Sequence, residues 1–272
     1  MPPSTQRSGQ PAEAACSPRE RRGPGPPRRP HSSRAAFGVT VPLTPEPAHP
    51  RAGGGTGDLS AFAPTAAFLY DVEDFLRDWL RDLAVEQDHN DGIVPIVVPD
   101  VVKYFTMPEG MPKPGATAIW GDAAVWVPRA LWTAYGDTAV LAEQFDSMTS
   151  HARVIAGMLA PSGVWDNGFQ FGDWLDPEAP PEEPFRSKAD HHVVATLCAY
   201  RTARIVADTA TILGRDAGEF TALAGRLSEL VARSGHRVST GFAGTPFITA
   251  ALTRTGHLDD AYGLLTQTEC PS

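Results

Sequence analysis

Apolar side chains along most of the chain recur at the spacing of one helix face. From residue 68 they fall at steps of one, three and four, and charged residues fill the positions between them. This spacing predicts a long amphipathic helix over residues 68–83. The apolar face of that helix consists of Phe68, Leu69, Val72, Phe75, Leu76, Trp79, Leu80 and Leu83.

The same spacing predicts further helices over residues 122–135, 141–159, 193–213 and 220–231, and two short ones over 246–253 and 258–266. Pro128 falls inside the first of these, and Asp137 is the expected N-cap of the second. Only residues 93–98 have the character of a strand. The chain is therefore predicted to be all-α, with antiparallel helix pairs in either a bundle or a toroid of concentric helices.

The N-terminal segment has a different composition. Residues 1–57 hold eight Arg, no Lys, three Glu and twelve of the 26 prolines, with almost no large apolar side chains. Such a segment buries too little apolar surface to offset its chain entropy, so residues 1–55 are predicted to be a disordered tail. The basic run over residues 19–29 also fits a tether for nucleic acid or membrane, although no aromatic residues interleave with it.

The remainder of the chain is strongly acidic, with fifteen basic and twenty-nine acidic residues after position 57. This charge argues against binding to nucleic acid, which depends on neutralising phosphates. No apolar run reaches the roughly 18 residues of a membrane span, and no signal segment opens the chain. The three cysteines are far apart, which fits a reducing compartment. We therefore expect a cytoplasmic protein without a membrane partner.

Three loops place glycine and aspartate together, two of them with tryptophan, and these are the candidates for chemistry. An indole face stacks on the C–H face of a sugar ring, and carboxylates accept sugar hydroxyls. The alternative is that the aspartates are helix caps and the tryptophans fill the core, and composition alone leaves both open. No metal or other cofactor is expected, since the adjacent His191 and His192 lack a third ligand at a suitable spacing. The loops hold Thr56, Gly57 and Asp58; Trp120, Gly121 and Asp122; and Gly172, Asp173, Trp174, Leu175 and Asp176.

Five motifs carry a resemblance to a known family. They are FAPTAAF at 62–68, NDGIVP at 90–95, GDAAVWVP at 121–128, GFQFGDWLDP at 168–177 and STGFAGTP at 239–246. In order and rough spacing they resemble the catalytic domain of bacterial α-L-rhamnosidases of glycoside hydrolase family 78, over residues 56–272. The resemblance implies an (α/α)6 toroid of six helical hairpins. It also implies inverting hydrolysis of terminal α-L-rhamnosyl groups, with rhamnose-containing glycosides or oligosaccharides as partners.

The resemblance also implies roles for individual residues. Asp58 resembles an aspartate that holds the rhamnose hydroxyls, and Trp120 and Trp174 resemble the tryptophans that wall the sugar pocket. Asp122, Asp173 and Asp176 lie in the same motifs and are further candidates for substrate binding.

The chain departs from the family pattern at the catalytic carboxylates. The general-acid glutamate is expected seven residues before Asp58, where Arg51 stands, and a tryptophan is expected at Gly55. The general-base glutamate is expected beyond Ser272, and a helix pair is expected near residues 216–220. We therefore expect an incomplete toroid that does not turn over, behind a tail over residues 1–55 that is not native sequence. A non-catalytic rhamnose-binding helical fragment and another (α/α)-barrel carbohydrate enzyme remain alternatives.

Overall fold

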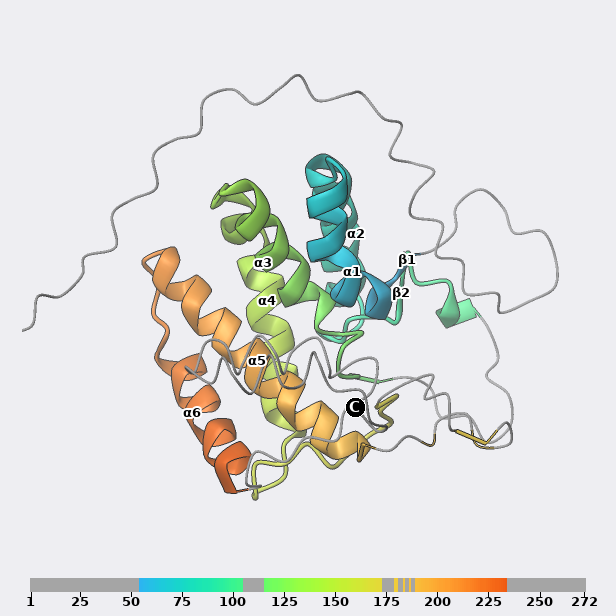
Figure 1. The fold of residues 1–272 in the computed structure, drawn as a ribbon, viewed down its shortest axis with the longest axis vertical. Helices are drawn as coiled ribbons and strands as arrows, with labels where there is room; N and C mark the ends of the chain where they lie inside the picture. The colour runs from blue at the N-terminus through green and yellow to red at the C-terminus, as the bar shows by residue number, and fades with distance from the viewer. Residues whose placement is uncertain are drawn as a thin grey trace, which may run out of the picture. The chain divides into compact units, whose positions relative to one another are not determined.

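The computed structural model describes residues 54–104, 115–172, 179–180, 183, 186 and 189–233, with side chains as far as residue 226. Three successive helix pairs make up this part of the chain (Figure 1). They are α1 (Thr56–Leu69) and α2 (Glu73–Asp88), α3 (Ala123–Tyr135) and α4 (Ala139–Met158), and α5 (His191–Ile212) and α6 (Gly218–Arg233). The short elements are β1 (Gly54–Gly55), β2 (Val97–Val98) and the 3-10 helix η2 (Val102–Tyr104).

Alternate helices pack on one another as in two concentric layers. Helix α1 packs on α3 and α3 on α5, while α2 packs on α4; α3 also packs on α4, and α5 on α6. Helix α3 lies between two apolar clusters, with Val125 and Trp126 in the cluster of α5 and α6, and Val127 and Leu131 in the cluster of α1 and α2. This arrangement confirms the predicted all-α fold and fits an arc of an (α/α)6 toroid.

The predicted helix over residues 68–83 is wrong at its start. Tyr70 adopts an extended conformation and ends α1, so Phe68 and Leu69 are the last residues of α1 and are exposed. Helix α2 then begins at Glu73, and the buried face of this segment begins at Val72 and continues through Leu76, Leu80 and Leu83. The apolar spacing crosses this break, which is why it does not reveal the two helices separately.

Local signals at the helix ends agree with the structure in most places. Gly136 ends α3 in the left-handed conformation, with its N–H bonded to the Trp132 carbonyl. Thr138, not Asp137, is the N-cap of α4, but Asp137 Oδ1 accepts the N–H of Ala139 at 2.8 Å and satisfies the first helical amide. Asp190 caps α5 by accepting two backbone N–H groups, those of His192 and Val193.

Several predictions concern residues outside the described part of the chain. These are the tail as far as residue 53, the two short helices over 246–253 and 258–266, and the STGFAGTP motif. Gly54 and Gly55, which the composition predicts as part of the tail, instead form β1, which pairs antiparallel with β2 through Gly54↔Val98 and Gly55↔Val97. None of the described helices has the length and apolar character that crossing a bilayer demands.

Candidate functional site

The first turn of α1 is anchored on the loop that carries the NDGIVP motif. Thr56 donates its backbone N–H to the Ile96 carbonyl at 3.0 Å and its hydroxyl to the Pro95 carbonyl at 3.1 Å. Gln87 in turn holds this loop to α4, because its amide bonds both the Gly92 carbonyl and the Ser147 carbonyl. The start of α1, which carries Asp58, is therefore anchored to this loop, and the loop is anchored to α4.

Asp58 lies in the first turn of α1, where a negative charge is favoured by the helix dipole. Its carboxylate folds back over Gly55, since a Cβ on Gly55 would lie 2.5 Å from Asp58 Oδ2. The residue as a whole is exposed, but its carboxyl is partly shielded from water, and this burial raises the pKa of Asp58. Its backbone hydrogen bond opposes that effect.

Trp120 meets α1 at Gly57, the neighbour of Asp58. A Cβ on Gly57 would come within 2.8 Å of three ring atoms, the closest being Trp120 Cε2 at 2.5 Å. No side chain larger than hydrogen fits there without moving the indole. Two of the three loops predicted to carry chemistry therefore come together, although they are more than sixty residues apart in the sequence.

An aromatic cluster extends from Trp120 into the GFQFGDWLDP motif. The Phe171 ring stacks on Trp120 with centroids 4.1 Å apart, and Phe169 meets Phe171 edge-on at 4.9 Å. Gln170, which lies between these two residues in the sequence, is buried; it accepts the Ala118 N–H at 2.8 Å and donates to the Ala116 carbonyl at 3.3 Å. This motif is thereby fastened to the loop before α3, and Trp120 remains half-buried.

The backbone just before Trp120 is strained. Ile119 is a β-branched residue with φ of 71°, a left-handed conformation that costs about 1–3 kcal/mol. Gly121 N–H bonds the Thr117 carbonyl at 2.9 Å, which closes the turn. A strained conformation of this kind persists only where surrounding contacts hold it.

Asp122 does not face solvent, contrary to what its motif suggested. Its side chain is fully buried: Oδ2 accepts the Ile119 N–H at 2.7 Å, and Oδ1 accepts from Thr202 and lies 3.3 Å from His151 Nε2. Both oxygens of this carboxylate therefore have hydrogen-bond partners inside the protein. The geometry favours a supporting role for Asp122, and its direct contact with a substrate stays a prediction.

Asp173, Trp174 and Asp176 lie outside the described residues, so their predicted roles stay predictions. The described loop leads up to them through Gly172, which has φ of 60°. A Cβ on Gly172 would clash with the His191 ring at the start of α5. His191 thus serves as a packing surface for the loop, and no group of three potential metal ligands occurs among the described residues.

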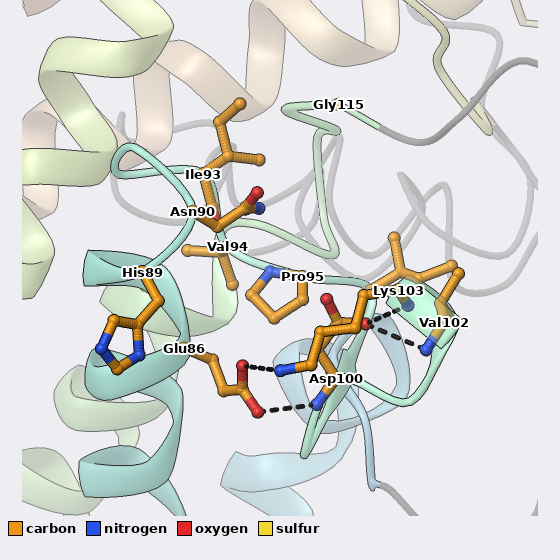
Figure 2. A pocket seen from close by; sticks show the side chains of 11 residues that line it. Glu86, His89, Asn90, Ile93, Val94, Pro95, Asp100, Val102, Lys103 and Gly115 are labelled. Atoms are coloured by element: carbon orange, nitrogen blue, oxygen red, sulfur yellow. Dashed lines mark hydrogen bonds and ion pairs between the residues drawn. The ribbon is translucent and has the colours of Figure 1, made fainter. Parts of the chain in front are cut away.

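A polar hollow lies between the end of α2, the NDGIVP loop and η2 (Figure 2). Glu86 accepts from Lys103 Nζ at 2.9 Å and from the Asp100 N–H at 3.2 Å. The Lys103 ammonium lowers the pKa of Glu86, with a smaller contribution from the Asp100 amide. Because Glu86 and Lys103 are paired with each other, these side chains serve to hold η2 to the end of α2, and the hollow does not have the character of a reactive site.

Four side chains that the sequence did not single out contribute to the site. Phe171 and Gln170 lie within a recognised motif and could have been found there by their place beside Trp174. His151 and Thr202 lie among the buried residues of α4 and α5, most of which are apolar or small. Gln144 and Thr209 are also polar and buried in these helices, so a buried polar position does not by itself single out His151 or Thr202.

Comparisons with known proteins agree with this architecture. The chain matches the family described as the bacterial alpha-L-rhamnosidase 6 hairpin glycosidase domain in two segments, residues 51–231 and 221–272. An alpha-L-rhamnosidase from Streptomyces avermitilis is 32% identical over 86% of this chain and 25% of its own length. One from Formosa agariphila is 27% identical over 80% of this chain and 27% of its own length.

Solved structures give the same result. The native alpha-L-rhamnosidase from Aspergillus terreus superposes with a TM-score of 0.61 at 29% identity, covering 83% of this chain and 31% of that one. The Streptomyces avermitilis alpha-L-rhamnosidase complexed with L-rhamnose gives a TM-score of 0.55 at 31% identity, covering 84% and 25%. The chain thus spans about a quarter of the length of the curated relatives it matches.

Proposed function

Because the chain belongs to the bacterial α-L-rhamnosidase six-hairpin glycosidase family, we propose that it forms the rhamnose-binding wall of such a catalytic domain. Its ligands are terminal α-L-rhamnosyl groups of glycosides or oligosaccharides. Asp58 accepts hydroxyl groups of the sugar, and Trp120 and Trp174 contact its apolar faces. The complete domain hydrolyses the glycosidic bond with inversion, using an acid and a base on opposite sides of the sugar.

The observation that supports this proposal most directly is the contact between Gly57 and Trp120. It brings the indole of one motif against Gly57, the residue next to Asp58 in another motif, at the start of α1. Carboxylates that accept hydroxyls next to an aromatic surface are the groups that sugar recognition requires. The loop that leads to Trp174 reaches the same indole through Phe171.

We further propose that this chain binds rhamnose without cleaving its glycosides. Arg51 occupies the position at which the family resemblance expects the general acid, and a guanidinium cannot donate its proton near neutral pH. Loss of a general acid typically lowers a rate by about 10²–10⁴-fold. For this chain we therefore propose rhamnose binding without catalysis.

Calorimetric titration of the purified chain with L-rhamnose tests the proposal. We expect saturable binding that is lost in Trp174→Ala and in Trp120→Ala, and no release of the phenol from an aryl α-L-rhamnoside. A folded, monomeric chain that does not bind rhamnose would contradict the proposed function. Turnover abolished by Asp58→Asn would overturn the non-catalytic part and show that another group acts as the acid.

A further inference from the structure

Polar side chains from α4, α5 and the start of α3 meet at one oxygen of Asp122. Thr202 in α5 donates its hydroxyl to Asp122 Oδ1, and His151 Nε2 in α4 lies 3.3 Å from the same oxygen. Trp126 in α3 donates its indole N–H to Thr202 Oγ1 at 2.9 Å. All four side chains are at most 2% exposed. Buried polar groups of this kind are costly unless paired, so the network has one well-defined geometry.

The other oxygen of Asp122 connects this network to the strained backbone. It accepts the N–H of Ile119 at 2.7 Å, the residue whose left-handed conformation immediately precedes Trp120. The carboxylate therefore links the interior of three helices to the turn that carries the indole. The strained conformation needs such external support to persist.

His151 also limits the space beside Trp120 directly. A Cβ on Gly121 would lie 2.5 Å from His151 Cε1, so the imidazole and the glycine fit closely together. A carboxylate oxygen accepts a hydrogen bond from His151 in the tautomer that carries its hydrogen on Nε2. Among the described residues the other ring nitrogen, Nδ1, has no hydrogen-bond partner. Among the described residues, the ring therefore has one hydrogen-bond partner, Asp122, besides its packing contact with Gly121.

We propose that His151 and Thr202 are positioning residues for Trp120: through Asp122 they hold Ile119 in the conformation that directs the indole toward Gly57 and Asp58. Neither side chain touches the sugar. The effect on sugar affinity rests on the proposed function, whereas the effect on the indole does not.

Two substitutions at Thr202 separate positioning from general packing. Thr202→Val keeps the volume and removes the hydroxyl, while Thr202→Ser keeps the hydroxyl. Thr209→Val is the matched control, because Thr209 lies in the same helix, is fully buried, and has a hydroxyl without a hydrogen-bond partner among the described residues. The Trp120 signal is isolated as the near-UV circular dichroism difference between each variant and the same variant carrying Trp120→Phe.

We expect Thr202→Val to lose most of the Trp120 difference band and to bind L-rhamnose about tenfold more weakly. Thr202→Ser and Thr209→Val should keep both. A folded Thr202→Val variant with the full Trp120 band would overturn the inference. If the native chain does not bind rhamnose, the proposed function fails, but the Trp120 band still decides the inference.

The same comparison on α4 covers the case in which Thr202→Val does not fold. His151→Gln keeps an N–H donor that can reach Asp122, and His151→Leu replaces the ring with an apolar side chain. The Trp120 band should survive in His151→Gln and fall in His151→Leu. Equal bands in these two variants would show that His151 contributes packing alone.

Discussion

Gly57 and Trp120 lie in contact so close that a single methyl group on Gly57 would enter the indole ring, 2.5 Å from Cε2. The glycine is thus required by the approach of a side chain and not by its own backbone conformation, since it sits inside the first turn of α1. This contact joins the residue next to Asp58 to the indole of a distant loop.

Gly57→Ala is therefore expected to displace Trp120 and weaken rhamnose binding. Overpacking of this kind costs about 1–3 kcal/mol, and we expect the affinity for L-rhamnose to fall by at least about tenfold. Calorimetric titration measures the affinity, and thermal unfolding measures the stability.

Gly157→Ala is the matched control for that substitution. Gly157 lies in α4, and a Cβ there meets no heavy atom of the described residues within 4 Å. Alanine in place of glycine inside a helix stabilises by about 0.5–1 kcal/mol. This variant should be slightly more stable and should bind rhamnose like the native chain. Equal affinities for the two alanine variants would contradict the proposed role of the Gly57 contact.

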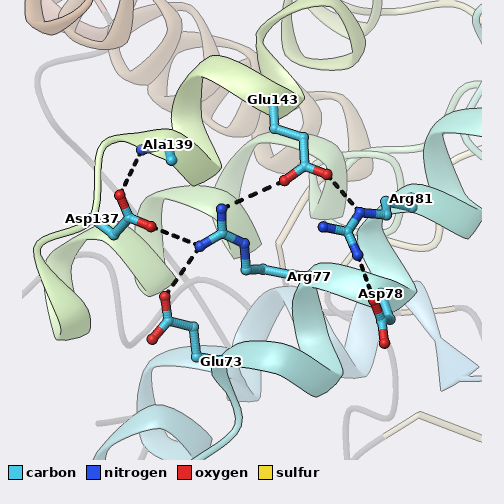
Figure 3. A network of polar contacts seen from close by, with 7 residues as sticks. All are labelled: Glu73, Arg77, Asp78, Arg81, Asp137, Ala139 and Glu143. Atoms are coloured by element: carbon cyan, nitrogen blue, oxygen red, sulfur yellow. Dashed lines mark hydrogen bonds and ion pairs between the residues drawn. The ribbon is translucent and has the colours of Figure 1, made fainter.

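Arg77 is the centre of a charged network between α2 and α4 (Figure 3). Its guanidinium lies 2.7 Å from Asp137, 3.2 Å from Glu73 and 3.6 Å from Glu143, and it is only 18% exposed. We expect Arg77→Met to lower the free energy of unfolding by about 1–2 kcal/mol, because three carboxylates lose a partly buried cation. Urea denaturation followed by far-UV circular dichroism measures this change.

Arg81→Met is the comparison for Arg77. Arg81 contacts Glu143 and Asp78 but is about half exposed, so water screens its ion pairs. Its loss should change stability less than the loss of Arg77. A larger effect at Arg81 would contradict the view that partial burial makes the Arg77 network matter.

Asp137 makes the stability of the fold sensitive to acid. Its pKa is lowered first by the hydrogen bond from the Ala139 N–H and then by Arg77. A carboxyl with a folded pKa below its unfolded value binds fewer protons when folded, so stability rises with pH across that interval. The contribution of Asp137 should be present above its ordinary pKa of 3.8 and be lost as the pH falls through the lower folded value.

Asp137→Asn tests this dependence, since it keeps an oxygen for the Ala139 amide but cannot titrate. The midpoint of urea unfolding should fall less steeply with acid in this variant than in the native chain. Parallel pH profiles for the two proteins would show that other carboxyls determine the acid response.

Local spacing along the sequence was enough to predict most helices but not the connections between distant residues. Helices α3 and α4 follow from apolar positions such as Leu141 and Met148, because burial of one helix face is a local pattern. The break at Tyr70 was missed because the apolar spacing continues across it.

The buried network around Asp122 depends on contacts between residues far apart in the sequence, which no local pattern predicts. The partners of Asp122 lie 29 residues away at His151 and 80 residues away at Thr202. The motif predicts a role for Asp122 in substrate binding, but its burial depends on where α4 and α5 pack. Asp58 and Trp120, in contrast, are predicted from their motifs alone, and the fold brings Trp120 into contact with Gly57, the residue next to Asp58. Their roles in sugar binding stay predictions.

Rhamnose binding is expected to depend on pH through Asp58. Burial raises the pKa of this carboxyl above its ordinary value of 3.8, so it takes up a proton at a higher pH than an exposed aspartate does. L-rhamnose is uncharged, and a protonated carboxyl offers one acceptor fewer to its hydroxyls. The affinity should therefore decline as the pH falls through the raised pKa, while far-UV circular dichroism confirms that the helices persist.

Asp58→Asn tests this dependence: it should bind rhamnose more weakly at neutral pH, and its affinity should not change with pH. The variant should also be at least as stable as the native chain, because a carboxyl whose pKa is raised by folding destabilises the fold when ionised. A native profile with its midpoint below 3.8, or one that Asp58→Asn reproduces, would show that a different group controls binding.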